Sequence, residues 1–107
     1  MNSELLALLL QTTAADALIH LIRQHELTIA TIQLLKERME RLQAAELAEA
    51  MRIAQLAYRL SLLMPAPAPS LGRRTLANAL LYMYLYHEAT QLYQQARAEY
   101  LAGGYTH

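Results

Sequence analysis

Apolar residues recur at intervals of three and four along most of this chain, the spacing of one face of an α-helix. Over 27–42 they form a first stripe: Ile32, Leu35, Met39 and Leu42. A second stripe follows after a loss of phase: Leu47, Ala50, Met51, Ala54, Ala57 and Tyr58. The interruption predicts a tight corner over 43–46 and a new helix that runs to about Met64. No period-two alternation of the kind found in β-strands appears.

The first 25 residues allow two arrangements. Ser3 can cap a helix, and Thr13 followed three residues later by Asp16 resembles a second capping signal. These signals predict a helix over 3–11 and another over 14–25. One continuous helix over 3–25 stays open as the alternative.

Helix-breaking residues are confined to two places. Proline occurs only at Pro65, Pro67 and Pro69, and glycine only at Gly72, Gly103 and Gly104. Alternating Pro and Ala favours an extended conformation, so residues 65–72 are predicted to be a semi-rigid linker between helices. A last helix is expected from about Arg74 to Ala102. The whole chain, 1–107, is thus predicted to be a single all-α domain, a bundle of four to five helices.

The composition favours association with other proteins. Hydrophobic residues make up 55% of the 107 positions, charged residues only 17%, and the formal net charge is zero. A core of this size cannot hide so many apolar side chains, and there is no repulsive net charge to keep copies apart. We therefore expect a protein partner or a homo-oligomer.

Other partners and compartments are disfavoured. Positive residues are spread along the chain, and Lys36 is the only lysine, so nucleic acid is disfavoured on charge. No stretch reaches the roughly 20 apolar residues of a membrane span. The first residues lack the basic region of a secretory signal, and cysteine is absent. We expect a cytoplasmic protein.

Tyrosine is the only aromatic residue, and six of the seven tyrosines follow Leu81. On a continuous helix, four of them share a face with small residues between them: Tyr82, Tyr86, Tyr93 and Tyr100. This seam is either an internal core stripe or a partner-binding surface, where an apolar ring with a polar end is favoured. Arg73 and Arg74, before the seam, are candidates to receive an acidic partner or a phosphate, although a solvated loop explains them equally well.

Candidate chemistry is sparse. Asp16 and His20 lie one helical turn apart, but a stable metal site needs further ligands. The chain has no glycine-rich phosphate loop, nucleophile elbow or metalloprotease motif. We expect no metal, no cofactor, no catalytic residue and no enzymatic activity.

One segment is similar to a known repeat family. Its matching residues are Leu76, Ala77, Ala89, Tyr93 and Ala96. Over 73–102 the chain resembles one tetratricopeptide repeat, a pair of helices. The family normally has a turn with Gly or Asn between them, whereas Met83-Tyr84-Leu85 favours a continued helix. The resemblance implies a helical scaffold that holds peptides or partner proteins.

Two functions are compatible with these features. The first is a protein-interaction module, such as a small adaptor, chaperone-like or inhibitory protein that docks through apolar and Tyr-rich helix faces. The alternative is a small helical subunit of a larger assembly, including a nucleoprotein complex. Salt separates them, because binding through phosphate contacts weakens steeply as salt rises.

Overall fold

The computed structural model describes residues 1–83 and 86–103, and these residues form six helices and no strand. The helices are α1 (Ser3–Gln11), α2 (Ala15–Gln24), α3 (Ile29–Leu42), α4 (Leu47–Ser61), α5 (Ala68–Tyr82) and α6 (Tyr86–Ala102). The predicted all-α bundle is confirmed, with six helices in the described residues where four to five were expected.

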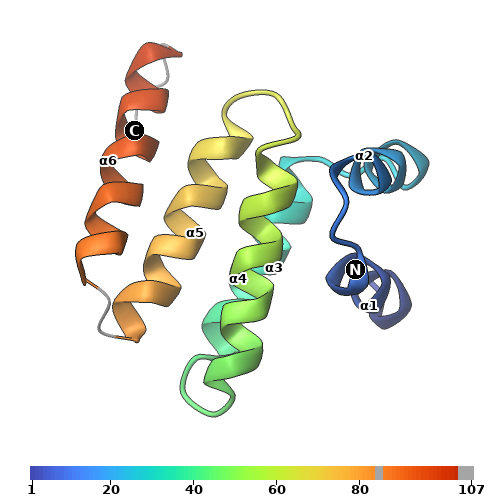
Figure 1. Ribbon diagram of the computed structural model, residues 1–107, viewed down its shortest axis with the longest axis horizontal. Helices are drawn as coiled ribbons and strands as arrows, with labels where there is room; N and C mark the ends of the chain where they lie inside the picture. The colour runs from blue at the N-terminus through green and yellow to red at the C-terminus, as the bar shows by residue number, and fades with distance from the viewer. Residues whose placement is uncertain (84–85, 104–107) are drawn as a thin grey trace.

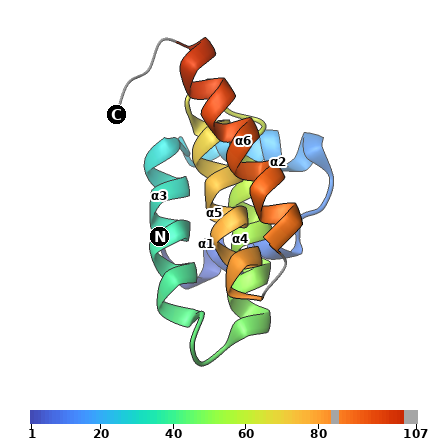
Figure 2. The ribbon, with the colours of Figure 1, turned by 90° about the vertical axis from the view of Figure 1, so that its left-hand side faces the viewer.

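The last four helices run alternately up and down. Figure 1 shows α4, α5 and α6 side by side, with α3 behind α4. Helix α5 is central, because it packs against α3, α4 and α6. The side view of Figure 2 shows α3 and α6 on different sides of α5. The N-terminal helices lie at the opposite edge from α6, and α1 packs on α4.

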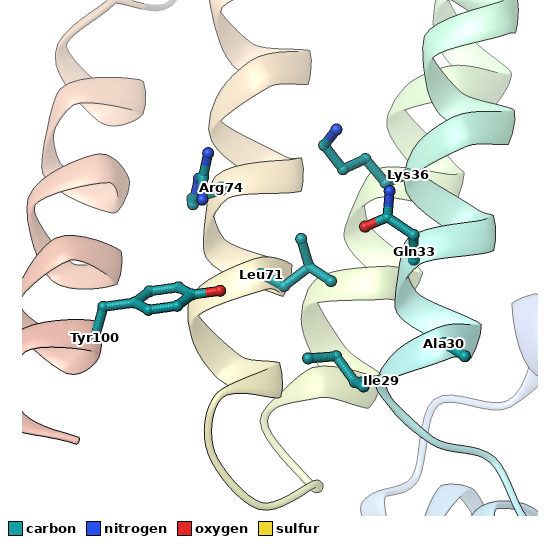
Figure 3. Close-up of a pocket in the computed structure, with 7 residues that line it drawn as sticks. All are labelled: Ile29, Ala30, Gln33, Lys36, Leu71, Arg74 and Tyr100. Atoms are coloured by element: carbon teal, nitrogen blue, oxygen red, sulfur yellow. The ribbon is translucent and has the colours of Figure 1, made fainter. Parts of the chain in front are cut away.

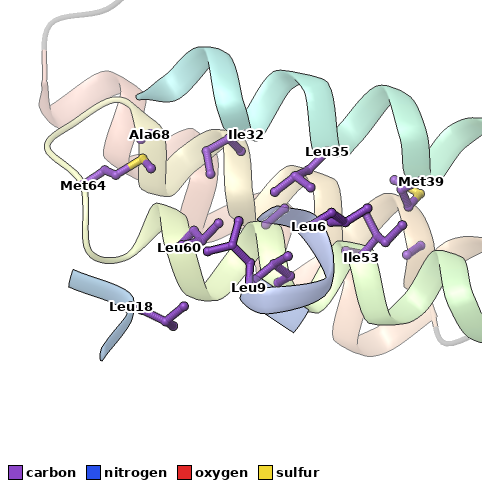
Figure 4. Close-up of a cluster of buried hydrophobic side chains, with 14 of the residues drawn as sticks. Leu6, Leu9, Leu18, Ile32, Leu35, Met39, Ile53, Leu60, Met64 and Ala68 are labelled. Atoms are coloured by element: carbon purple, nitrogen blue, oxygen red, sulfur yellow. The ribbon is translucent and has the colours of Figure 1, made fainter. Parts of the chain in front are cut away.

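Most residues of the two apolar stripes read from the sequence lie in the core or against it, although Leu47 is exposed. Ile32, Leu35 and Met39 of α3 are buried against α4. The buried face of α4 includes Ile53, Ala54, Leu56, Ala57 and Leu60. Leu6 and Leu9 of α1 close this core from the side, as Figure 4 shows. The corner predicted over 43–46 is confirmed, because α3 ends at Leu42 and α4 begins at Leu47.

Helices α4 and α5 approach each other closely at Gly72. A Cβ atom at that position would lie 1.8 Å from the Ser61 Oγ and 2.5 Å from the Ser61 Cβ. Ser61 is itself fixed, because its hydroxyl donates to the Tyr58 carbonyl at 2.7 Å. Gly72 is therefore required by the packing of the two helices.

The N-terminal segment forms two helices, but its capping residues differ from those predicted. Asn2 caps α1, since its side-chain oxygen accepts from the Leu5 N–H at 2.8 Å, and Ser3 already belongs to the helix. Ala14 precedes α2 without a side-chain cap, so the Thr13 signal was wrong. The cap thus lies one residue earlier than predicted. The short Asn2 side chain satisfies an N–H of the first turn that has no partner within the helix.

The predicted linker is shorter than expected. Helix α5 begins at Ala68, so residues 68–72 are helical where an extended linker over 65–72 was predicted. Pro69 fits the first turn of this helix, because the N–H that proline lacks would have no intrahelical partner there.

The predicted last helix is divided in two. Helix α5 ends at Tyr82, where the N–H of Met83 still bonds to the Ala79 carbonyl, and α6 starts at Tyr86. Residues 84–85 lie outside the described part. Folding α6 back on α5 buries Ala96 and pairs Arg73 with Glu99, contacts that one straight helix could not make. Tertiary packing here overrides local helix propensity.

Candidate partner-binding groove

A groove opens where α3, α5 and α6 meet, with a volume of about 430 Å³. Its lining residues are Ile29, Ala30, Gln33, Lys36, Leu71, Arg74 and Tyr100. Leu71 and Arg74 belong to α5 and form the floor, because this helix lies between the other two (Figure 3). The Tyr100 ring extends from α6 toward α5, and Lys36 and Gln33 extend from α3 (Figure 3). The groove is thus lined by three helices.

The regular spacing of α3 and α5 explains which residues meet here. Ile29, Gln33 and Lys36 are four and three positions apart, so they share one face of α3. Leu71 and Arg74 are three apart on α5. On α3 this face adjoins the buried stripe of Ile32 and Leu35, and so the groove residues border the core without belonging to it.

The charge of the groove is positive. It holds Lys36 and Arg74, and no acidic side chain of the described residues lines it. Lys36 is partly neutralised by Glu40 of the same helix, whose carboxylate lies 2.7 Å from the Lys36 Nζ. Arg74 is exposed and makes no ion pair within residues 1–83 and 86–103. Arg74 therefore carries the stronger attraction for an anionic group.

The positive charges of Lys36 and Arg74 both act on the Tyr93 side chain. Its hydroxyl donates to the Asn78 side-chain oxygen, which joins α6 to α5. Burial raises the pKa of Tyr93 above its ordinary value, while the positive charges of Arg74 and Lys36 lower it in part. The two cations thus act on the same region, although they belong to different helices.

A second polar contact fixes α6. The Arg73 guanidinium donates to the Glu99 carboxylate and, at 3.3 Å, to the Tyr58 hydroxyl. Burial alone would lower the pKa of Arg73, but Glu99 and Tyr58 raise it, so the group stays charged. Glu99 precedes Tyr100 directly, and this ion pair therefore helps to place the Tyr100 ring at the groove.

The structure brings together two of the six residues predicted to bind a partner, Arg74 and Tyr100. Arg73 faces Glu99 and Tyr58 instead, and Tyr93 is half-buried near the groove. Tyr82 is on α5 with 47% of its surface exposed, so the seam is not continuous across the break between the helices. The side chain of Tyr86 lies outside the described part.

Sequence reasoning missed the contribution of α3. Gln33 and Lys36 were not singled out, because a single lysine on the polar side of a helix is normally a solvated residue. The available signal was their spacing from Ile29, which marks a second face beside the apolar stripe. Only the packing of α3 beside α5 brings that face to the groove.

Comparison with known proteins gives no match to a family model, a curated protein or a solved structure. The resemblance of residues 73–102 to a tetratricopeptide repeat thus stays a prediction. Among the described residues, no helix is long and apolar enough to cross a membrane. In the same part of the chain, no three His, Asp or Glu side chains are grouped to hold a metal ion.

Proposed function

We propose that the protein is an interaction module that holds an acidic segment of a partner protein in the groove between α3, α5 and α6. The observation that carries this proposal is the pair of cations, Lys36 and Arg74, on two helices of a groove with no acidic lining among the described residues. A carboxylate that enters the groove gains charge-assisted hydrogen bonds with the Arg74 guanidinium, which has no ion pair with another described residue.

The other lining groups favour a polypeptide segment over an isolated anion. Ile29 and Leu71 offer apolar contact, Gln33 offers an amide, and Tyr100 offers a ring with a hydroxyl. Interfaces are typically built from such a mixture, with tyrosine and arginine enriched at their centres. The apolar excess of the composition fits the same proposal, because an interaction surface uses apolar residues that a small core cannot hide.

The test is a comparison of proteins retained by three immobilised forms of the full chain. These are the unmodified protein, Arg74→Glu in the groove, and Arg97→Glu as a matched control on an exposed part of α6 outside the groove. We expect one or more proteins to be retained by the unmodified protein and the control and lost with Arg74→Glu. Retention that is equal for all three forms would contradict the proposal.

Nuclease treatment of the cell extract that supplies the partners distinguishes this proposal from the alternative, a subunit of a nucleoprotein complex. A partner held through nucleic acid would disappear from all three forms after treatment, whereas a directly bound acidic segment would persist. A second copy of this chain is the other alternative. In that case sedimentation would show self-association that Arg74→Glu abolishes, with no other protein retained.

A further inference from the structure

A second cavity lies beside the groove, at the end of the bundle where the turn between α2 and α3 meets the turn between α4 and α5. It has a volume of about 370 Å³ and is lined by Ile22, residues 27–29 and residues 63–68. We call this second cavity the chamber. Ile29 lines both the chamber and the groove. On α5, Ala68 lines the chamber and Leu71, one turn further on, lines the groove. The two cavities are therefore adjacent parts of one surface.

The chamber offers mainly apolar walls. Its lining holds no charged residue among those described, and Thr28 is its one side chain with a hydroxyl. That hydroxyl accepts from the Ala30 N–H at 3.3 Å as the cap of α3.

Several backbone N–H groups of the chamber already have partners. The N–H groups of Leu27, Met64 and Ala68 donate to carbonyls within their own turns. Pro65 and Pro67 have no N–H to offer. A polar group that entered the chamber would lose its water and find few partners, whereas an aliphatic group would gain by leaving water.

We infer that the chamber is the anchor subsite of the groove and takes an aliphatic side chain of the same acidic segment. This inference rests on the function proposed above. It assigns the segment two determinants: a carboxylate at Arg74 and Lys36, and an aliphatic side chain at the proline turn. The difference in charge between the adjacent cavities fixes which determinant occupies which cavity.

The helix geometry sets the distance between the two determinants. Ala68 and Arg74 are six residues apart on α5, and Thr28, the cap of α3, lies eight residues before Lys36. At 1.5 Å per helical residue these separations are about 9 and 12 Å, which an extended segment spans in about three to four residues. The acidic and aliphatic residues of the partner are therefore expected about three to four positions apart.

The probe is a displayed library of random twelve-residue peptides, selected on the full chain. Parallel selections use Arg74→Glu, Ala66→Phe, which places a ring in the chamber from an exposed position, and Ala48→Phe as a control on the exposed side of α4. Circular dichroism establishes that each variant keeps its helicity. We expect an acidic and an aliphatic residue at the stated spacing with the unmodified protein and Ala48→Phe. The aliphatic preference is lost with Ala66→Phe, and the acidic preference with Arg74→Glu.

Titrations with one selected peptide and its aliphatic→Ala form test whether the two cavities are occupied by one segment. Truncation should weaken binding to the unmodified protein about tenfold to a hundredfold, and binding to Ala66→Phe hardly at all. If Ala66→Phe does not fold, Leu27→Ala, which removes part of the chamber wall, replaces it and must weaken the selected peptide more than its truncated form.

Acidic peptides without a spaced aliphatic residue would overturn this inference and leave the proposed function standing. Peptides without acidic residues, or a selection unchanged by Arg74→Glu, would overturn both. A library that yields no specific peptide would also overturn the inference, while the comparison of retained partner proteins would still decide the proposed function.

Discussion

Helices α4 and α6 have similar lengths, 15 and 17 residues, but different chemistry holds them in place. Helix α4 buries an apolar face against its neighbours. Among the side chains described in α6, only Ala96 is buried. The polar contacts that join this helix to α5 include Glu99 with Arg73 and Tyr93 with Asn78. Apolar burial therefore stabilises the bundle, while directional polar contacts position the helix that brings Tyr100 to the groove.

The largest expected effect is on the free energy of unfolding, and it is tested with one leucine from each helix. Leu56 of α4 is fully buried, and Leu92 of α6 is half-buried. Leu56→Ala should lower the free energy of unfolding by about 2–5 kcal/mol, whereas Leu92→Ala should lower it by about 1 kcal/mol or less. Urea titrations followed by circular dichroism measure both. Equal losses would show that α6 depends on apolar packing as much as α4 does.

The next effect tests the close approach of α4 and α5. Gly72→Ala places a methyl group against Ser61 and should cost about 1–3 kcal/mol, as overpacking typically does. In a Ser61→Gly background the same substitution should cost clearly less, because the two nearest atoms are gone, although the Ala57 carbonyl oxygen, at 3.1 Å, remains. Thermal melts of the unmodified protein, the two single variants and the double variant give the coupling energy between positions 61 and 72. A cost that is the same in both backgrounds would mean that the contact is not the cause.

Removal of the polar contacts should affect α6 more than the whole protein. Glu99→Gln breaks an ion pair between partly exposed groups, so its global cost should be only about 0–1 kcal/mol. Amide hydrogen exchange in α6 should nevertheless accelerate, while exchange in α4 stays unchanged. Glu88→Gln, at an exposed position of the same helix, is the matched control. Acceleration that spreads equally over α4 and α6 would contradict the division of roles.

The last effect, also at most about 1 kcal/mol, concerns the end of α2. Glu26 has a φ of 52°, a left-handed conformation, and the Leu27 N–H beyond it donates to the Ile22 carbonyl at 2.9 Å. Glycine is the usual residue at this position of a helix end. Glu26→Gly should therefore raise the free energy of unfolding by about 0.5–1 kcal/mol. Glu46→Gly, before α4, should bring no such gain, because Glu46 has a φ of −135°. A stabilisation by both would point to charge and not to backbone conformation.

The same comparison explains which parts of the fold were predictable. The stripes around Ile32 and Ala54 predicted α3, α4 and the corner between them, because burial on both helices follows helical periodicity. The break after Tyr82 has no glycine or proline to mark it among residues 73–102. It depends on contacts such as Arg73 with Glu99, which are 26 positions apart. Local propensity carries no information about such contacts.

The candidate site divides in the same way. Arg74 and Tyr100 were singled out from the sequence because cations and tyrosines are common at interfaces. Lys36 and Gln33 were not, because their position at the groove depends on the packing of α3 beside α5. The chamber was also missed, since residues 65–72 were predicted to be an extended spacer and not a wall.

The most direct test of the account places a photo-reactive benzoylphenylalanine at Gln33 inside the groove or at Gln55, exposed on α4 outside it. Each form is irradiated in an extract of the cells that naturally contain the protein, and the cross-linked adducts are mapped by mass spectrometry. We predict partner adducts at Gln33, through a segment that contains acidic residues, and none of the same partner at Gln55. Adducts of one partner at Gln55 alone, or equally at both positions, would contradict the assignment of the groove as the binding site.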